Sequence, residues 1–346
     1  MIDFAGWEMP LSYHSVIDEH LHTRRACGVF DISHMGRLIV RGTDALSLLE
    51  EVCTRRLGTA AVGQSRYAHI CNPQGGVLDD VIVSRFEDHW LVVCNAVNRE
   101  KILAWLYDHL GRRGAAIDDR THATAMVAVQ GPVAIELASG LLDGEPGALG
   151  RYRFARMAFE GDPCTVFRSG YTGEDGVEVI LGAERAEALW GRLCDRRAAD
   201  GGRAEPVGLA ARDTLRLEAG MPLYGHELGE QIDSLTAGLA WCVDLGKDFI
   251  GRDALKAIAG TGPARRLVGL HIEGRRIPRQ GMAVTLAGRP VGEVASGTMS
   301  PTLGRPIATA FIDAEHARSG ICLQVDLRGR SSEAQVTSLP FYRRPK

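Results

Sequence analysis

The stretch of residues 72–98, NPQGGVLDDVIVSRFEDHWLVVCNAVN, constrains the fold most strongly. A Gly75-Gly76 turn precedes a β-branched apolar run over 77–83, and a polar connection leads from it to a second apolar run over 90–94. Short β-branched runs that have turn residues at both ends are typical of strands. The pattern therefore predicts a β-hairpin.

An adjacent acidic pair, Asp79-Asp80, lies inside the first of these predicted strands. Neighbouring residues of a strand point to opposite faces, so one carboxylate must face the side that its apolar neighbours define as interior. A lone carboxylate in that position costs several kcal/mol unless a group pairs with it, hydrogen-bonds it or binds against it. The alternative is structural: one aspartate faces solvent and the other caps a bulge.

The chain length and charge limit the kinds of protein that this can be. At 346 residues it exceeds a usual single domain, so two or three domains are expected. The net charge is −3 without a strongly basic block, and no apolar segment approaches the roughly 20 residues of a membrane helix. We therefore expect neither nucleic acid nor a membrane as a partner.

The cysteines and the amino terminus indicate the compartment. The eight cysteines are scattered and never form CxxC, which favours free thiols in a reducing compartment and no metal site. The first residues, MIDFAGWEMP, lack the basic and apolar regions of a signal peptide. A cytoplasmic location is expected.

The first helix is predicted over residues 14–27, with Val16, Ile17 and Leu21 on its apolar face. The segment FDISHMG follows it. His34 in this segment is expected to be a hydrogen-bonded structural histidine rather than a catalyst.

A further helix is predicted after the hairpin. Asn98 is its expected N-cap, because asparagine is favoured there and apolar residues recur at helical spacing behind it. Residues 111–123 are polar and rich in Gly, Arg and Asp, so they are expected to form a connection.

Residues 164–181 repeat the strand, turn and strand pattern. In the second strand Glu178 shares a face with Ile180, and a carboxylate among apolar neighbours needs a partner. A solvated glutamate on an edge strand is the alternative. Residues 207–220 are predicted to be helical, with Arg212 and Asp213 in otherwise apolar surroundings. A buried arginine usually marks a paired carboxylate or an anionic ligand.

The last part of the chain, from about Pro263, contains only short strands separated by Gly, Pro and Arg-rich turns. The expected strands are 267–272, 282–286, 290–295, 307–312, 321–326 and 333–338. This spacing predicts a small all-β barrel or sandwich. No Walker loop, GxGxxG after a strand, HExxH or GxSxG is present. The chain is thus predicted to be α+β followed by a β module, with chemistry that depends on carboxylates, an arginine and an organic cofactor.

Eight segments in order resemble the aminomethyltransferase (T-protein) family of the glycine cleavage system. They are DFAGWEMP (3–10), GVFDISHMG (28–36), GGVLDD (75–80), VQGP (129–132), SGYTGEDGVE (169–178), GLAARDTLRLEAGMPLYGHEL (208–228), KDFIGRDAL (247–255) and SGTMSPTLGRPIA (296–308). Together they extend the resemblance over essentially the whole chain.

The resemblance implies an α+β fold of three domains around a central cavity that holds tetrahydrofolate. The first two domains would have antiparallel sheets plus helices and would be discontinuous: 1–35 plus 122–225, and 36–121 plus 226–262. Residues 263–346 would form a β-barrel of jelly-roll type. The implied reaction takes an aminomethyl group from the lipoyl arm of the H-protein. Tetrahydrofolate accepts the one-carbon unit as 5,10-methylenetetrahydrofolate, and ammonia is released.

The resemblance also implies roles for individual residues. Asp80 matches the catalytic aspartate, Glu178 matches the acidic residue that binds the pterin, and Arg212 matches the folate-site arginine. The further cofactor-binding candidates are Tyr67, Asn95, Tyr171 and Tyr342. A carboxylate is suited to the catalytic role because it stabilises the cationic, iminium-like centre that forms when the donor carbon loses a heteroatom.

Two alternatives remain. One is a tetrahydrofolate-dependent demethylase of a small methylated substrate, and the other is a non-catalytic, folate-binding accessory protein. The presence of Asp80, Glu178 and Arg212 favours the aminomethyl reaction, and no cysteine lies in a conspicuous reactive motif.

Overall fold

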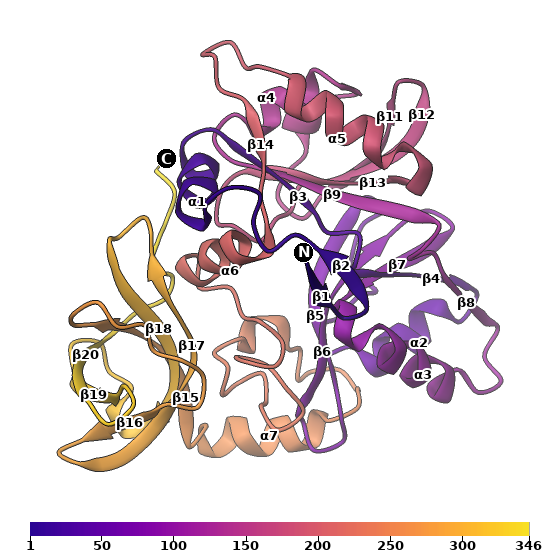
Figure 1. The fold of residues 1–346 in the computed structure, drawn as a ribbon. Coiled ribbons are helices and arrows are strands. Elements are labelled where there is room, and N and C mark those ends of the chain that lie inside the picture. Colours follow the sequence, from indigo (N-terminus) through magenta and orange to yellow (C-terminus); the bar gives the residue numbers. More distant parts are fainter. Residues whose placement is uncertain (346) are drawn as a thin grey trace.

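The computed structural model describes residues 1–345 and arranges them as two helix-covered sheets and a closed barrel (Figure 1). This confirms the α+β class and the carboxyl-terminal β-barrel. The α-helices are α1 (Val16–Arg25), α2 (Ala45–Val52), α3 (Arg99–Leu110), α4 (Ala134–Ser139), α5 (Ala186–Asp195), α6 (Leu209–Glu218) and α7 (Arg252–Thr261). The 3₁₀ helices are η1 (Ala96–Asn98), η2 (Pro146–Ala148), η3 (Ala183–Arg185), η4 (Ala240–Cys242) and η5 (Ala314–His316).

The seven-stranded sheet has the order β10-β11-β12-β13-β9-β3-β14. Its strands are β3 (Cys27–Asp31), β9 (Thr124–Gln130), β10 (Leu142–Asp143), β11 (Phe154–Phe159), β12 (Asp162–Phe167), β13 (Gly176–Gly182) and β14 (Ala204–Pro206). Every pairing is antiparallel except that of β14 with β3. A buried apolar core fills the space between this sheet and helices α4 and α5.

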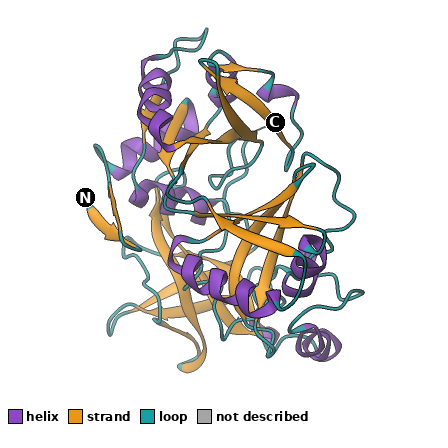
Figure 2. Ribbon diagram, turned by 90° about the vertical axis from the view of Figure 1, so that its right-hand side faces the viewer, coloured by secondary structure: helices purple, strands orange, loops and turns teal. Residues whose placement is uncertain are grey.

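The five-stranded sheet has the order β5-β6-β7-β4-β8 and contains the predicted hairpin. Its strands are β4 (Gly36–Gly42), β5 (Gln64–Cys71), β6 (Val77–Arg85), β7 (His89–Cys94) and β8 (Ala115–Asp119). Strands β6 and β7 pair antiparallel from Ile82 with Val93 to Arg85 with Trp90, which confirms the hairpin. Helices α2 and α3 pack on one face, and in Figure 2 helices cover the strands on that side.

A further apolar core, separate from those under the helices of each sheet, lies between the two sheets and reaches α6. Its buried members include Phe30 of β3, Val93 of β7 and Leu215 of α6, so it joins segments that are far apart in the sequence. The inner faces of the two sheets therefore meet across this core, here called the inter-sheet core.

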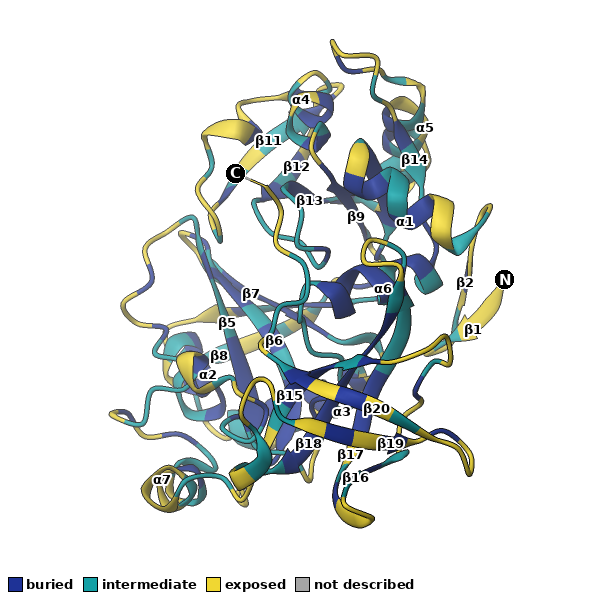
Figure 3. Ribbon diagram, turned by 90° about the vertical axis from the view of Figure 1, so that its left-hand side faces the viewer, coloured by how far each residue is buried: buried dark blue, intermediate teal, exposed yellow. Residues whose placement is uncertain are grey.

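The barrel closes in the order β15-β18-β17-β16-β19-β20, because β15 pairs with both β18 and β20. Its strands are β15 (Arg265–Ile272), β16 (Ala283–Leu286), β17 (Arg289–Ser300), β18 (Arg305–Asp313), β19 (Cys322–Asp326) and β20 (Ser331–Thr337). Exposed and buried residues alternate along β19 and β20, as Figure 3 shows, because side chains point in turn to solvent and to the barrel interior. The remaining strands, β1 (Ile2–Phe4) and β2 (Trp7–Met9), form a small hairpin.

Two local predictions are wrong. Helix α1 buries its polar side instead of the predicted apolar face. Ile17, a member of that apolar face, is 54% exposed. The reason is that His20 and Arg24 form hydrogen bonds with the carboxylate of Glu218 on α6. Residues 111–123 are also more than a connection, since they contain the edge strand β8, whose charged residues suit an exposed edge.

No helix in residues 1–345 combines the length and the hydropathy that a bilayer crossing requires.

Candidate functional site

The alternation of β6 places Asp79 and Asp80 on opposite faces of the five-stranded sheet. Asp79 shares its face with Val81 and Val83, which pack against α2 and α3. Asp80 shares the other face with Ile82, which packs in the inter-sheet core. Asp79 is completely buried and Asp80 is partly buried, so both carboxylates are directed to the interior of the protein.

Asp79 is held by amide donors. Its carboxylate accepts hydrogen bonds from the Asn95 backbone N–H at 2.9 Å, the Asn95 side-chain amide at 2.8 Å and the Asn98 side-chain amide at 2.6 Å. Burial, followed by the charge of Asp80, raises the pKa of Asp79 to about 7. Asn98 stands at the N-cap position of α3 as predicted, but its side chain makes no cap hydrogen bond because it binds Asp79 instead.

Asp80 also has only neutral donors. The Tyr67 hydroxyl donates to its carboxylate at 3.0 Å, and the Asn95 side-chain amide donates at 2.7 Å. Burial raises the pKa of Asp80, and these two hydrogen bonds act in the opposite direction. In the described part of the chain, no lysine, arginine or histidine is among the hydrogen-bond partners of either carboxylate. Two adjacent acids without a cation titrate as a pair, because ionisation of one opposes ionisation of the other.

Glu178 lies on β13 and shares its face with Ile180, which packs in the inter-sheet core. The side chain is buried, with the residue 7% exposed, and it accepts a hydrogen bond from the Ser169 hydroxyl. Burial raises the pKa of Glu178, while the Ser169 hydrogen bond and the charge of Arg212 act against that rise. Of the two alternatives for Glu178, the structure shows the interior carboxylate beside Ile180 and not a solvated glutamate on an edge strand, because β13 lies between β12 and β9.

Arg212 and Tyr171 lie next to Glu178. The Arg212 guanidinium carbon is 4.7 Å from the centroid of the Tyr171 ring, within the range of a cation–π contact. The Tyr171 hydroxyl donates to the Pro222 carbonyl. Arg212 Nη1 is buried and has no hydrogen-bond partner among residues 1–345. A buried guanidinium donor without an acceptor leaves a hydrogen bond for a ligand to complete.

The side chains around Asp80 and those around Glu178 face one region. Burial raises the pKa of Tyr171, and the charge of Asp80 acts in the same direction. Asp80 and Glu178 are on the inner faces of their respective sheets, since Ile82 and Ile180 both pack in the inter-sheet core. The structure thus brings together six predicted site residues: Asp80, Tyr67, Asn95, Glu178, Arg212 and Tyr171.

Tyr342 belongs to a different cluster. The Arg24 guanidinium carbon lies 3.9 Å from the centroid of its ring, and its backbone N–H donates to the Glu218 carbonyl at 2.8 Å. Burial and a hydrogen bond with Glu174 raise the pKa of its phenol to about 12. Its contacts join the carboxyl-terminal tail to α1 and α6, and they include none of the other six predicted residues.

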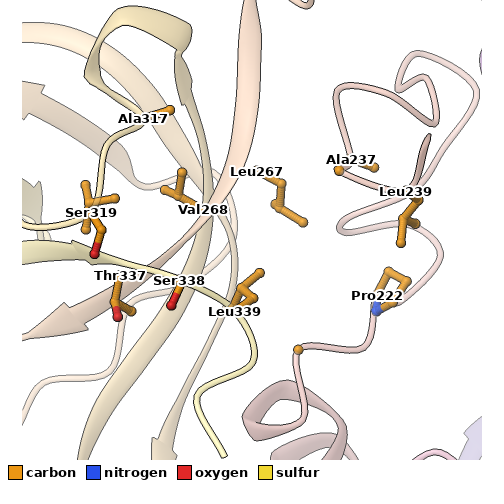
Figure 4. Close-up of a pocket in the computed structure, with 13 residues that line it drawn as sticks. Pro222, Ala237, Leu239, Leu267, Val268, Ala317, Ser319, Thr337, Ser338 and Leu339 are labelled. Carbon is orange, nitrogen blue, oxygen red and sulfur yellow. The ribbon is translucent and has the colours of Figure 1, made fainter. Parts of the chain in front are cut away.

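A cavity of about 330 Å³ lies between the barrel and the segment that follows α6 (Figure 4). Its lining comes from Gly220, Pro222, Ala237, Gly238, Leu239, Leu267, Val268, Ala317, Ser319, Val336, Thr337, Ser338 and Leu339. None of the seven predicted site residues lines it. Pro222 nevertheless connects the two places, because its carbonyl accepts the Tyr171 hydrogen bond.

Sequence reasoning missed the most buried arginine of α6. Arg216 is 1% exposed and forms ion pairs with Asp213 at 2.8 Å and with Glu227 at 3.0 Å. The Asp213 side chain is 47% exposed, so the expectation that it lies inside is wrong. The i, i+3 spacing of Asp213 and Arg216 was the available signal.

The environment of His34 also differs from the prediction. The residue is 3% exposed, but its Nδ1 has no hydrogen-bond partner within the described chain. Burial, followed by the charges of Arg212 and Arg37, lowers its pKa to about 3. His34 is therefore a neutral, buried histidine, and its Nδ1 is without a hydrogen bond in residues 1–345.

Comparisons with known proteins agree across both parts of the chain. The GCVT N-terminal domain family matches residues 1–247, and the glycine cleavage T-protein C-terminal barrel domain matches residues 265–343. A protein from Streptomyces avermitilis named aminomethyltransferase is 46% identical over 353 residues, which cover 100% of this chain and 94% of that protein. Another aminomethyltransferase, from Rubrobacter xylanophilus, is 45% identical over 348 residues, with coverage of 100% and 91%.

A solved structure gives the same result. The crystal structure of glycine cleavage system aminomethyltransferase T from Bartonella henselae matches with a TM-score of 0.90 and 34% sequence identity. The match covers 99% of this chain and 94% of that one. The chain therefore belongs to the glycine cleavage T-protein family, the aminomethyltransferases.

Proposed function

We propose that the enzyme takes the one-carbon unit of an aminomethyl group from the lipoyl arm of an H-protein and transfers it to tetrahydrofolate. Ammonia is released, 5,10-methylenetetrahydrofolate is formed, and the reduced lipoyl group stays on the H-protein. Asp80 is the catalytic carboxylate. The observation that carries this assignment is an interior carboxylate with only neutral donors, directed to the same region as Glu178 and Arg212.

The environment of Asp80 suits a reaction that passes through a cation. A carboxylate paired with arginine or lysine would already be neutralised, whereas Asp80 has only the hydroxyl of Tyr67 and the amide of Asn95. Its charge is available to stabilise a carbon that becomes positive as it loses a heteroatom. The same carboxylate can orient or remove the proton of an attacking nitrogen.

The Glu178 region suits a pterin ring. The pterin presents an amino group and a ring N–H as donors beside a carbonyl acceptor, so it complements a buried carboxylate together with a free guanidinium donor. Glu178 supplies the acceptor, and Arg212 Nη1 is the buried donor without a protein partner in residues 1–345. Tetrahydrofolate would be held there with its reacting nitrogens toward Asp80.

A cytoplasmic location and the three-domain division belong to the same proposal. The division into 1–35 plus 122–225, 36–121 plus 226–262, and 263–346 is supported by the membership of the sheets. All strands of the seven-stranded sheet fall in the first part, those of the five-stranded sheet in the second, and those of the barrel in the third.

The test is ammonia release by the purified protein with aminomethylated H-protein and tetrahydrofolate. Asp80→Asn is expected to lower kcat by roughly two to three orders of magnitude, because it removes the charge that stabilises the cationic centre. Binding of tetrahydrofolate, measured by calorimetry, should persist. Asp118→Asn, whose side chain is 47% exposed on β8, is the matched control and should retain full activity.

Near-normal turnover by Asp80→Asn would show that this residue is structural. If methylated small molecules supported one-carbon transfer to folate and aminomethylated H-protein did not, the enzyme would be a demethylase.

A further inference from the structure

His69 lies directly opposite Asp80 in the sheet. The antiparallel register of β5 and β6 pairs His69 with Asp80 and Tyr67 with Ile82. Residues that face each other across an antiparallel pair point to the same side, and so do residues two apart on one strand. His69, Tyr67 and Asp80 therefore occupy one face of the sheet, the face that the proposed function uses.

A chain of hydrogen bonds connects these side chains to the loop after α6. His69 Nδ1 is 2.7 Å from the Ser234 hydroxyl, and His69 Nε2 is 3.3 Å from the Tyr67 hydroxyl. The Tyr67 hydroxyl in turn donates to Asp80 at 3.0 Å. Ser234 and His69 are both completely buried.

The available protons fix the direction of this chain. The single hydroxyl proton of Tyr67 goes to Asp80, so the Tyr67 oxygen must accept from His69 Nε2–H. A neutral imidazole has one N–H, so Nδ1 is the acceptor and the Ser234 hydroxyl donates to it. Every donor in the chain then points toward Asp80.

His69 remains neutral in this arrangement. Burial lowers its pKa to about 3. The titratable groups that face it are Tyr67, Asp80 and Cys242. The Cys242 sulfur lies 3.8 Å from Nδ1 and 3.7 Å from Nε2. The Cys242 thiol donates to the Leu239 carbonyl, so it does not replace Ser234 as the donor to the ring.

The ring of Tyr67 is held on two sides. Trp241 stacks on it with ring centroids 5.4 Å apart and an interplanar angle of 25°. His69 meets it edge-on, with centroids 5.4 Å apart and an angle of 76°. These contacts fix the ring, while the hydrogen bond from His69 decides the direction of the hydroxyl proton.

We propose that His69 and Ser234 are positioning residues that keep the Tyr67 hydroxyl directed as a donor at Asp80. The proposal rests on the proposed function, in which Asp80 is the catalytic carboxylate. Hydrogen bonds in series strengthen one another, so the Tyr67 hydroxyl becomes a better donor when its oxygen accepts from His69. A stronger hydrogen bond from the Tyr67 hydroxyl stabilises the ionised form of Asp80. Asp80 is then ionised in preference to its neighbour Asp79.

The pH profile of kcat is the first readout. His69→Leu and Ser234→Ala remove successive members of the chain and should lower kcat near neutral pH by about 3- to 10-fold, the scale of one hydrogen bond. The acid limb should move to higher pH, and KM for tetrahydrofolate should stay unchanged. His69→Gln retains an N–H that can reach Tyr67 and should recover most of the rate.

A matched control lies on the same strand and face. Ser65 is buried and shares a hydrogen bond of 2.7 Å with Ser84, outside the chain to Asp80. Ser65→Ala removes a buried hydroxyl as Ser234→Ala does, but it should leave the acid limb in place. The other titratable groups that face Asp80 are Tyr67, Tyr171 and Cys242, and Asp79 acts on it from the opposite face of the sheet; all four are kept in these variants.

A second readout needs no substrate. Carbon-13 NMR of aspartate-labelled protein, with the Asp80 signal assigned by Asp80→Asn, should show a higher pKa of Asp80 in His69→Leu and Ser234→Ala. In a Tyr67→Phe background, His69→Leu should add no further shift. If His69→Leu and Ser234→Ala left both the carboxyl titration and the acid limb unchanged, the positioning role would be overturned. If His69→Leu and Ser234→Ala shifted the pKa of Asp80 while Asp80→Asn kept its activity, the proposed function would fail. The role of His69 and Ser234 in positioning the Tyr67 hydroxyl would still be supported.

Discussion

The Glu218→Gln substitution should destabilise the protein strongly, because one buried carboxylate joins three parts of the fold. Glu218 is the last residue of α6 and is completely buried. Its carboxylate accepts from His20 Nε2 at 3.1 Å and from Arg24 Nη2 at 3.0 Å on α1. On the barrel side it accepts from the hydroxyls of Ser300 and Thr302 and from the Thr302 N–H.

Two arguments give the magnitude. Burial alone would raise the pKa of Glu218, but hydrogen bonds from His20, Ser300 and Thr302 hold it at about 2, below its ordinary value of 4.5. A depression of this size corresponds to about 3 kcal/mol of stability, since each pKa unit is about 1.4 kcal/mol. Removal of one partner from a buried ion pair independently costs roughly 3–5 kcal/mol. Glutamine keeps the shape but turns an amide N–H₂ toward groups that are themselves donors.

The sign of the pH dependence follows from the depressed pKa. The contribution of Glu218 is fully present above its unfolded value of 4.5 and is lost as the pH falls toward about 2. Urea unfolding followed by tryptophan fluorescence should show a loss of about 3 kcal/mol for Glu218→Gln near pH 7. The difference from the wild type should become smaller below about pH 4.5.

Glu293→Gln is the control, because its side chain is 56% exposed on the barrel, and it should change the free energy of unfolding by less than about 0.5 kcal/mol. A loss below about 1 kcal/mol for Glu218→Gln near pH 7 would refute the reasoning. A loss that stayed constant into the acid range would do the same.

Four further outcomes are expected. Glu178→Ala should weaken tetrahydrofolate binding by about 1.5–3 kcal/mol in calorimetry. If the wild type and the variant had equal dissociation constants for tetrahydrofolate, the pterin would not bind at Glu178. Gly76→Ala should destabilise the fold by about 1–3 kcal/mol in urea unfolding, because the new Cβ would lie 1.9 Å from the Glu230 carbonyl oxygen. Gly191→Ala on α5 meets no atom within 4 Å and should instead stabilise it slightly. The rate of ammonia release should saturate as the H-protein concentration rises. It should fall as salt is added, because salt weakens transient contacts between charged surfaces. A rate of ammonia release that did not depend on H-protein would contradict this prediction.

The sequence determined the features that depend on local periodicity. The hairpin over 72–98 was predictable because two short β-branched runs flank a polar connection, and the barrel was predictable from repeated strands after Pro263. The same alternation required that Asp79 and Asp80 point to opposite faces, and that Glu178 lie beside Ile180. These relations hold along a single strand, so they need no knowledge of what packs against it.

Some local patterns gave the wrong answer because partners from elsewhere decided the outcome. The apolar spacing of α1 predicted one buried face. Helix α1 instead buries His20 and Arg24, because both form hydrogen bonds with the carboxylate of Glu218 on α6. On α6, Asp213 was expected inside but its side chain is 47% exposed, and the additional interior arginine is Arg216, which Glu227 neutralises.

The arrangement of the site is a result of tertiary structure. Strand alternation requires Asp79 and Asp80 to point in opposite directions, but only the packing of the two sheets decides that Asp80 and Glu178 both lie on the side of the inter-sheet core. The pairing of His69 with Asp80 likewise depends on the register of β5 against β6, and a shift of one residue would turn His69 to the other face. Ser234 approaches His69 from a loop 165 residues further along the chain. Contacts between segments so distant arise from the burial of whole sheets and helices, and no local pattern of residues encodes them.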